Sequence, residues 1–349
     1  MFLEDSAATS ANVSAGDLNG DGHMDLVLVK GRHWPLLDMV LLGDGTGRFQ
    51  EPYPVGPQAD RSYSGVLLDL DVDGDLDIVV SNDRPDPKVV HLNDGSGRFT
   101  IGSTFGQPEW STRHVSVADL NRDSVPDVVL ANRYGDDTGP SFICFGDGLG
   151  GFRAPCTAAS QGSATTITTA DFNGDGAPDL VVPHRDGGQS YVYLNDGSGG
   201  FAETRPFGPP TAAIRSAKAG DFNRDGVLDL AVIDERTGPA VFYGTENGAF
   251  GAGRPLGDRG ARPYAILVAD LDQEGSSDII VGHVESRPIA YLNDGAGGFT
   301  ALPFGDDEGV AYGFTVADFD EDGVLDIAMA RSDARNVLYF GSWAMPSDS

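Results

Sequence analysis

The chain has 349 residues and a net charge of −30, from 53 acidic and 23 basic residues. Such an excess of acid argues against a surface that binds nucleic acid or anionic membranes. The sequence has no apolar run that approaches the roughly 18 residues of a membrane-spanning helix, so we expect no membrane insertion.

The chain begins with a short apolar segment, Met1-Phe-Leu3, followed by Glu4 and Asp5. This start has neither the basic region nor the apolar region of a signal peptide, so we expect none within this sequence. The segment resembles the beginning of a β-strand instead.

An acidic nine-residue loop follows, with the sequence Asp17-Leu-Asn-Gly-Asp-Gly-His-Met-Asp25. Side-chain oxygens at loop positions 1, 3, 5 and 9 and the backbone carbonyl at position 7 are the hard oxygen ligands that Ca²⁺ prefers. The apolar stretch Leu26–Val29 comes directly afterwards. A strand rather than a helix therefore leaves the loop, which distinguishes it from an EF-hand.

The same acidic loop occurs seven times, at intervals of 48 to 52 residues. The loops open at Asp17, Asp69, Asp119, Asp171, Asp221, Asp270 and Asp318. A fixed motif with a period near 50 residues indicates a repeat architecture. The alternative is a set of acidic turns without metal, but seven copies in register favour up to seven structural Ca²⁺ ions.

The predicted metal ligands are the residues at positions 1, 3, 5, 7 and 9 of each loop. They are Asp17, Asn19, Asp21, His23 and Asp25; Asp69, Asp71, Asp73, Asp75 and Asp77; Asp119, Asn121, Asp123, Val125 and Asp127; Asp171, Asn173, Asp175, Ala177 and Asp179; Asp221, Asn223, Asp225, Val227 and Asp229; Asp270, Asp272, Glu274, Ser276 and Asp278; and Asp318, Asp320, Asp322, Val324 and Asp326. We expect the weakest sites at Asp119, where Ser124 replaces a glycine, and at Asp270, where Glu274 is a longer ligand.

Each unit continues with a third strand, a turn rich in Asn, Asp and Gly, and a fourth strand that starts at a Phe. One example is Asn93-Asp-Gly-Ser-Gly-Arg-Phe99. Such turns supply the positive-φ positions that hairpins need. Cys144 and Cys156 flank one of these turns almost symmetrically. They either form a disulfide across two strands or are two separate thiols.

Four antiparallel strands in each of seven units predict an all-β fold, a seven-bladed β-propeller that spans residues 1–349 as a single domain. The last unit stops at Tyr339-Phe-Gly341 without a fourth strand. We expect the N-terminal segment to supply this strand, so that the two ends of the chain complete the last blade and close the ring.

The units resemble FG-GAP/VCBS repeats, the blades of integrin α-subunit heads and of many bacterial and fungal secreted proteins. The resemblance covers almost the whole chain and implies Ca²⁺ in the loops between the first and second strands. It does not imply one function, because similar propellers serve as adhesion heads, as lectins and as catalytic domains of some polysaccharide lyases and sugar dehydratases.

Cationic and aromatic residues occupy the positions that a propeller places on the face opposite the acidic loops. The residues six before each loop, which should surround the central channel, are Ala11, Tyr63, Arg113, Thr165, Arg215, Tyr264 and Tyr312. The residues predicted to bind a ligand on this face are Arg32, Arg84, Arg113, Arg133, Arg185, Arg215, Trp34 and Trp110.

Arginine recognises carboxylate, sulfate or phosphate, and aromatic rings stack on sugars. The alternative is that these arginines pair with local acids such as Asp83, Asp186 and Glu235 and join neighbouring blades.

Two classes of function fit this face. The first is a monomeric binding module for an anionic small molecule or glycan. The second is an enzyme of lyase, dehydratase or isomerase type without an organic cofactor, in which Arg neutralises a carboxylate and His or Tyr moves a proton. The catalytic candidates are His33, His114, His184, His283, Tyr63, Tyr264 and Tyr312. Because so many calcium loops suit the calcium-rich exterior better than the cytosol, we expect a secreted or periplasmic protein.

Overall fold

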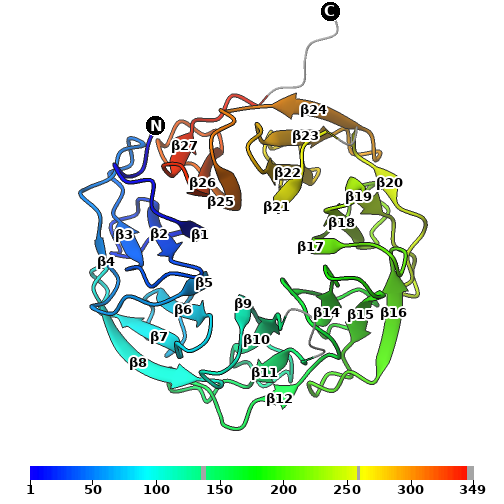
Figure 1. The fold of residues 1–349 in the computed structure, drawn as a ribbon, viewed down its shortest axis with the longest axis horizontal. Helices are drawn as coiled ribbons and strands as arrows, with labels where there is room; N and C mark the ends of the chain where they lie inside the picture. Colours follow the sequence, from blue (N-terminus) through cyan, green and yellow to red (C-terminus); the bar gives the residue numbers. More distant parts are fainter. Residues whose placement is uncertain (135–138, 258–259, 344–349) are drawn as a thin grey trace, which may run out of the picture.

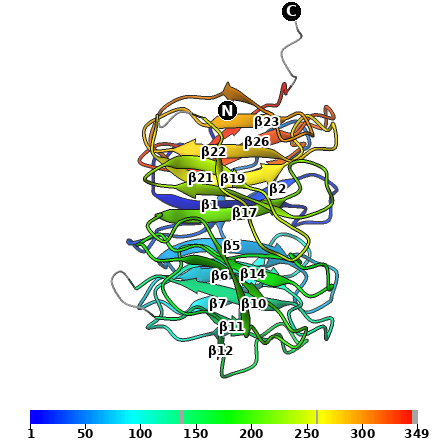
Figure 2. The same ribbon diagram turned by 90° about the vertical axis from the view of Figure 1, so that its right-hand side faces the viewer.

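The computed structural model describes residues 1–134, 139–257 and 260–343. In these residues, the regular structure consists of 27 β-strands in seven antiparallel sheets, arranged as blades around a central channel (Figure 1). A view turned by 90° shows that the strands run between the two faces of the ring (Figure 2). The predicted seven-bladed propeller is confirmed. The described residues include no helix long and apolar enough to cross a membrane.

Within each blade the strands follow chain order from the channel to the rim (Figure 1). Blades 1 to 4 contain β1 (Ser10–Gly16), β2 (Asp25–Lys30), β3 (Met39–Leu41) and β4 (Tyr53–Pro54); β5 (Ser62–Leu68), β6 (Asp77–Asn82), β7 (Lys88–Asn93) and β8 (Phe99–Phe105); β9 (Thr112–Ala118), β10 (Asp127–Asn132), β11 (Phe142–Cys144) and β12 (Thr157–Ala158); and β13 (Thr168–Ala170), β14 (Asp179–Val182), β15 (Ser190–Leu194) and β16 (Glu203–Phe207). Blades 5 to 7 contain β17 (Ile214–Gly220), β18 (Asp229–Asp234), β19 (Gly238–Phe242) and β20 (Arg254–Pro255); β21 (Pro263–Ala269), β22 (Asp278–His283), β23 (Ile289–Asn293) and β24 (Phe299–Pro303); and β25 (Val310–Ala317), β26 (Asp326–Ser332) and β27 (Val337–Tyr339).

The second strand of every blade is buried along its whole length. Both faces of this strand pack against neighbouring blades, which explains why its sequence is continuously apolar instead of alternating. The buried apolar residues form seven clusters, and each cluster lies between two adjacent blades. The Phe of the hairpin between the third and fourth strands of blades 1 to 6 contributes to them. It begins the fourth strand, as predicted, only in β8 and β24 of the described chain and precedes that strand in the other blades. Phe49 of blade 1, for example, meets Phe319 of blade 7 at 5.8 Å between ring centroids.

The N-terminal segment completes blade 7, as predicted. Phe2 forms an antiparallel bridge with Val337 of β27. The backbone N–H of Leu3 donates to the Asn336 carbonyl at 3.0 Å, and the N–H of Leu338 donates to the Met1 carbonyl at 2.8 Å. The Leu3 side chain is buried in the cluster between blades 7 and 1. The two ends of the described chain therefore share one sheet.

Cys144 at the end of β11 and Cys156 just before β12 are joined by a disulfide. The bond crosses the hairpin of blade 3, whose strands also meet in the bridge between Gly146 and Phe152. This decides between the two alternatives that the sequence left open.

In every second blade, an asparagine at or just after the end of the third strand connects the blade to the preceding one. The amide of this Asn donates to the carbonyl at loop position 2 of the preceding blade. The three bonds run from Asn93 to Leu18 at 2.8 Å, from Asn195 to Leu120 at 2.8 Å, and from Asn293 to Phe222 at 3.0 Å. They join blade 2 to 1, blade 4 to 3 and blade 6 to 5. In blades 1, 3, 5 and 7 the corresponding residue is a glycine, which has no side chain to donate.

We expect Leu3→Ala to lower the free energy of unfolding by about 2–4 kcal/mol, because truncating a buried leucine leaves a cavity. Urea unfolding followed by intrinsic fluorescence measures the loss. Ile101→Ala, at an exposed position of β8, is the matched control and should change stability by less than about 0.5 kcal/mol. Equal effects of the two substitutions would contradict the assignment of the N-terminal segment to blade 7.

Candidate functional site

The aspartate at position 9 of each acidic loop is buried and accepts two backbone hydrogen bonds. One oxygen accepts the N–H of loop position 2, and the other accepts an N–H from the turn that follows the third strand of the same blade. Donor–acceptor distances are 2.7–3.0 Å in all seven blades. The residues are Asp25, Asp77, Asp127, Asp179, Asp229, Asp278 and Asp326. This carboxylate therefore joins the acidic loop to that turn and places both on one face of the ring.

Burial raises the pKa of these position-9 carboxyls, to about 6 for Asp25, Asp229 and Asp278. The two backbone hydrogen bonds oppose this rise, and the neighbouring carboxylates of the same loop add to it. A desolvated carboxylate next to like charges is in an environment that a bound cation would stabilise.

The first aspartate of each loop shapes the turn. Its carboxylate accepts the N–H of loop position 6 at 2.8–3.1 Å in all seven loops. In the third loop, position 6 is Ser124, which adopts the positive φ of 67° that glycine has elsewhere and still donates to Asp119 at 2.9 Å. The departure from the sequence pattern therefore leaves the turn intact.

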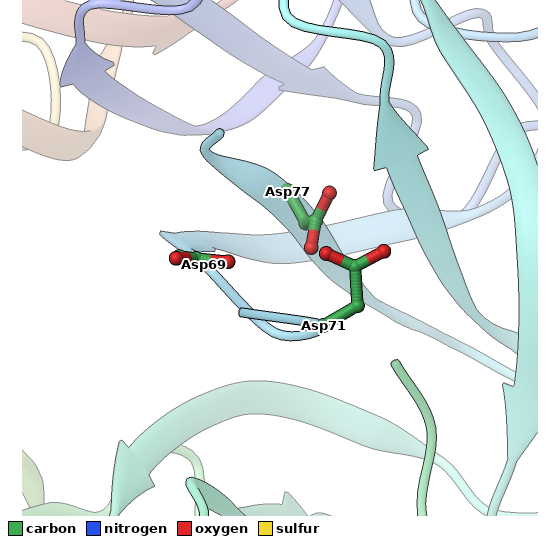
Figure 3. Close-up of side chains that lie close together, drawn as sticks. All are labelled: Asp69, Asp71 and Asp77. Atoms are coloured by element: carbon green, nitrogen blue, oxygen red, sulfur yellow. The ribbon is translucent and has the colours of Figure 1, made fainter. Parts of the chain in front are cut away.

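Three loops bring three carboxylates together, with ligand oxygens within 4.8 Å of one another. They are the loops of Asp69, Asp71 and Asp77 (Figure 3), of Asp270, Asp272 and Asp278, and of Asp318, Asp320 and Asp326. In each loop one oxygen of the aspartate at position 1 or 3 is buried without a hydrogen-bond partner in the described residues: Asp71 Oδ1, Asp270 Oδ1 and Asp320 Oδ1. Oxygens that lack a donor are suited to a divalent cation.

The other four loops carry Asn at position 3 and form more internal hydrogen bonds. The Asn amide donates to the carboxylate at position 5 at 2.8–3.1 Å, as in Asn19 to Asp21. Glu274 of the sixth loop contacts Ser276 and lies 3.7 Å from Arg224, outside the group of three carboxylates. The carboxylates of the Asp270 loop, which the sequence predicted to be one of the weakest sites, thus gather within the same 4.8 Å as those of the Asp69 and Asp318 loops.

Residues at loop position 4 connect successive loops around this face. Arg122 and Arg224 donate to the carbonyls of Asp175 and Glu274 at 2.7 and 2.9 Å, and Gln273 donates to Gly323 at 2.9 Å. Glu321 of blade 7 meets His23 of blade 1 at 2.6 Å, and this hydrogen bond raises the pKa of His23.

The opposite face opens into the central channel through a cavity that we call the channel mouth. It contains about 760 Å³ of empty space, part of it open to solvent. The residues six before each loop all line it: Ala11, Tyr63, Arg113, Thr165, Arg215, Tyr264 and Tyr312. His114 and Lys218 also line the cavity, whereas no Asp or Glu of the described residues does. On a protein of net charge −30, this cavity is a basic and aromatic exception.

Acidic residues just outside the channel mouth neutralise several of its arginines and join neighbouring blades. Arg113 pairs with Asp83 of blade 2 at 2.8 Å, and Arg133 pairs with Asp186 of blade 4 at 2.7 Å. Glu235 contacts Arg185 at 2.6 Å, Arg262 at 2.8 Å and Arg215 at 3.1 Å. These ion pairs agree with the alternative given by the sequence, in which the arginines pair with local acids and join neighbouring blades.

Arg32 differs from these arginines. Its Nη1 donates to Ser332 Oγ at 3.2 Å, and its guanidinium lies 3.8 Å from the centroid of the Tyr312 ring. Its Nε is buried without an acceptor, and no carboxylate of residues 1–134, 139–257 or 260–343 forms an ion pair with it. Arg32 is thus a cation beside the channel mouth, packed on Tyr312 but not part of the cavity lining, and no acid of the described residues neutralises its charge.

Tyr264 and Tyr312 form a pair beside Arg32, with their hydroxyl oxygens 2.6 Å apart. Arg215 lies 3.4 Å from the centroid of the Tyr264 ring. Burial alone would raise the pKa of Tyr264, but the charge of Arg215 and the hydrogen bond with Tyr312 bring it below its ordinary value. Burial raises the pKa of Tyr312. The two hydroxyls therefore share one hydrogen bond in a cationic environment.

His33 and Trp34 extend the aromatic surface beyond Tyr63. His33 Nε2 is 3.1 Å from the Tyr63 hydroxyl, and burial together with the charge of Arg113 lowers the pKa of His33. Trp34 is 70% exposed, an unusual state for so large an apolar ring.

Several residues that the sequence proposed for this site have other contacts. Trp110 stacks on Phe142 at 3.9 Å and packs against the core between blades 2 and 3. His283 Nδ1 is 2.9 Å from the Arg287 carbonyl, and the buried His184 Nε2 has no partner in the described residues. None of these three side chains lines the channel mouth. The other predicted residues outside its lining are Arg32, His33, Trp34, Arg84, Arg133 and Arg185.

Lys218 is a channel residue that the sequence reasoning missed. It stands three residues before its acidic loop, where other blades carry Ser14, Ser116, Thr168 and Thr315. Aligning the seven units in register would have singled it out, because the other six units carry Ser, Thr, Val or Leu at this position.

The fold and the acidic loops together define an all-β propeller with candidate divalent-cation sites in its blades. Five stretches match the FG-GAP-like repeat, over residues 17–80, 69–130, 171–232, 221–281 and 273–329. These stretches cover more than half of the chain, which therefore belongs to the FG-GAP-like repeat family.

Two integrin subunits are similar to part of the chain. Human (Homo sapiens) integrin alpha-7 is 29% identical over 162 residues, which cover 38% of this chain and 14% of that protein. Xenopus laevis integrin alpha-4 is 29% identical over 155 residues, which cover 37% of this chain and 14% of that protein. The chain thus matches only a small part of the length of these relatives.

Solved structures share the fold over nearly the whole chain. An Agrocybe aegerita lectin, described as recognising non-reducing terminal N-acetylglucosamine, has a TM-score of 0.63 and 20% identity and covers 93% of this chain and 86% of its own. BBS1N in complex with ARL6DN has a TM-score of 0.64 and 13% identity and covers 97% of this chain and 94% of its own. At such identities the similarity shows the fold alone.

Glu235→Gln should destabilise the protein at neutral pH by about 1.5–3 kcal/mol, because it removes charged hydrogen bonds and leaves three arginines unpaired. Burial alone would raise the pKa of Glu235, but Arg185 and Arg262 hold it down at about 2, below its usual 4.5. Since the folded-state pKa is depressed, the stabilisation is present above pH 4.5 and is lost as the pH falls towards 2.

Urea unfolding of wild type and variant between pH 7 and pH 3 measures this difference. The difference in the free energy of unfolding between wild type and variant should become smaller below pH 4.5. Glu246→Gln, at an exposed glutamate on the face of the acidic loops, is the control and should leave stability unchanged across the range. A difference that stays constant with pH would show that Glu235 acts by packing rather than by charge.

Proposed function

We propose that this protein is a calcium-stabilised propeller that binds an anionic carbohydrate at the channel mouth. The observation that carries the proposal is the lining of that cavity, which is basic and aromatic and includes no acid of the described residues, on a strongly acidic protein. A neutral sugar would need only the tyrosines, whereas the cations favour a ligand with a carboxylate or sulfate group.

Arg32 is the anchor that we assign to the acidic group of the ligand. Arg113, Arg133 and Arg215 already contact carboxylates, so a ligand would have to compete with Asp83, Asp186 and Glu235 for them. Arg32 needs no such exchange, and its buried Nε gains the acceptor that it lacks. An unsatisfied buried donor is costly, so a ligand that satisfies it gains affinity.

The tyrosines supply the surface for the sugar ring. Tyr63, Tyr264 and Tyr312 line the cavity, Arg32 packs on the ring of Tyr312, and the exposed Trp34 lies on the same face. Flat aromatic faces bind the apolar faces of sugar rings. The lectin with the same fold is described as recognising N-acetylglucosamine, which supports a carbohydrate as the ligand class.

The enzyme alternative has one observation in its favour, the short hydrogen bond between the Tyr264 and Tyr312 hydroxyls. The proposed base His114 fits that role poorly, because burial lowers its pKa to about 3. A base of such low pKa accepts protons weakly at neutral pH. Binding is therefore the function that we propose.

Calcium is the ion that we propose for the acidic loops. Asp69, Asp71 and Asp77 would hold it through carboxylate oxygens, and the corresponding residues of the other loops would do the same. The orphaned oxygen of Asp71 fits a cation ligand, and an all-oxygen set suits Ca²⁺ better than a softer metal. Bound there, the ion would neutralise the repulsion between the loop carboxylates.

The disulfide and the calcium loops together support a location outside the cytosol. Disulfides persist in oxidising compartments, and many calcium loops are best filled at external calcium levels. We propose a secreted or periplasmic protein.

Arg32→Gln should weaken binding of methyl glucuronide about tenfold or more, because a charged hydrogen bond contributes roughly 1.5–3 kcal/mol. Saturation-transfer NMR or calorimetry measures the affinity. Methyl glucoside, which lacks the carboxylate, should bind weakly to both wild type and variant. Arg48→Gln, near the hairpin of blade 1 on the face of the acidic loops, is the matched control. Equal binding of glucuronide and glucoside would contradict the preference for an anion.

Removal of calcium should lower the melting temperature by many degrees. An ion at 100 times its dissociation constant stabilises the folded state by about 2.7 kcal/mol per site. Melting in EGTA, in calcium and in magnesium measures the effect, and calcium should restore more stability than magnesium does.

Asp71→Asn is the matched variant, because Asp71 Oδ1 forms no hydrogen bond within the described residues. It should melt no lower than wild type in EGTA, since it relieves repulsion, and should gain less from calcium. An unchanged melting curve in EGTA, with metal analysis showing no bound ion, would rule out a structural role.

A further inference from the structure

Lys218 on β17 stands at a register where three other innermost strands contact the next blade. Three residues before their loops, Ser14, Ser116 and Thr168 donate their hydroxyls to backbone carbonyls of the next blade, at 2.5–2.9 Å. Lys218 stands at the same register in blade 5. Its amine forms no hydrogen bond or ion pair within residues 1–134, 139–257 and 260–343, and its side chain lines the channel cavity instead.

The other two lysines of the chain are satisfied. Lys30 pairs with Glu4 at 2.5 Å, and both side chains are nearly fully buried. Lys88 donates to the carbonyls of Gln107 and Trp110 at 2.9 and 2.8 Å. Lys218 is therefore the lysine whose ammonium lacks a counter-charge or an acceptor among the described residues.

The surroundings of Lys218 offer hydrogen-bonding groups but no negative charge. The channel mouth, which Lys218 lines, is also lined by His114, Thr165, Thr166, Ser216, Arg113 and Arg215. No carboxylate of the described residues lines it. Burial lowers the pKa of Lys218, and burial together with the charge of Lys218 keeps His114 neutral. Thr165 Oγ1 is buried without a hydrogen-bond partner in the described part of the chain.

An ammonium in this position is desolvated without compensation, and an anion in the channel would remove that cost. We propose that Lys218 forms, with the hydroxyls beside it, an anion subsite in the channel that takes a carboxylate. The inference uses the cavity of the proposed function but a different group from Arg32. The carboxylate comes either from a free small acid or from the ligand at the mouth.

Three lysines make the test direct. In protein labelled with ¹³C-lysine, Lys30, Lys88 and Lys218 give three Cε resonances, assigned with Lys218→Met. Acetate, methyl glucuronide and methyl glucoside are the probes. A bound carboxylate should raise the apparent pKa of the Lys218 amine by about one unit, which corresponds to a tenfold preference for the ammonium form. Lys30 and Lys88 serve as internal references and should not respond.

The outcomes separate the two sources. A response to acetate identifies a free small acid, whereas a response to glucuronide alone, lost in Arg32→Gln, identifies the ligand at the mouth. By calorimetry, Lys218→Arg should retain carboxylate binding and Lys218→Met should lose it. If no carboxylate shifts the Lys218 resonance, the subsite is refuted. If the Lys218 resonance does not shift but glucuronide still binds in an Arg32-dependent way, the proposed function stands without the Lys218 subsite.

Discussion

The loop face of this propeller depends on the buried aspartate at position 9 of each acidic loop. With one oxygen it holds the turn of its own loop, and with the other it holds the turn that follows the third strand of the same blade, as Asp179 does with Phe172 and Asn195. A carboxylate with two backbone donors is stabilised as the anion, although its burial opposes that charge. Each blade therefore contains a buried negative charge at the edge of its core. The other loop carboxylates add to it, which makes a cation the natural complement of this face.

The charges of the two faces are arranged in opposite ways. On the loop face, carboxylates gather without enough donors, as the orphaned oxygens of Asp71 and Asp320 show. At the channel mouth, arginines gather, and acids outside the cavity neutralise most of them; Glu235 alone contacts three. Ion pairs that join blades fix the positions of the neutralised arginines. Among the described residues, Arg32 beside the cavity and Lys218 within it form no ion pair, so they remain available to a ligand, Arg32 together with the Tyr312 ring on which it packs.

The fold could be predicted from the sequence because each blade repeats the same local signals. Loop, apolar strand and Gly-rich turn return in register, and even the closure of blade 7 followed from the absence of its last strand. The mouth could be located for the same reason, but its charge state could not. Whether Arg113 is available depends on Asp83 of the neighbouring blade, a contact that spacing does not reveal. The disulfide was left undecided because symmetric spacing about a turn is compatible with two free thiols. Trp110 was placed at the mouth from its position in a connection, whereas its ring stacks on Phe142 in the core.

The asparagine that connects every second blade to the preceding one bears on which unit was duplicated to form the repeats. Its bonds, with those of Arg122 and Arg224, fall inside the pairs of blades 1–2, 3–4 and 5–6. The loops that open at Asp17, Asp119 and Asp221 also stand at equal intervals along the chain. This is the pattern that duplication of a pair of blades would leave. Three such pairs account for six blades, and blade 7 is the one outside them. Blade 7 is also the blade that takes its last strand from the other end of the chain.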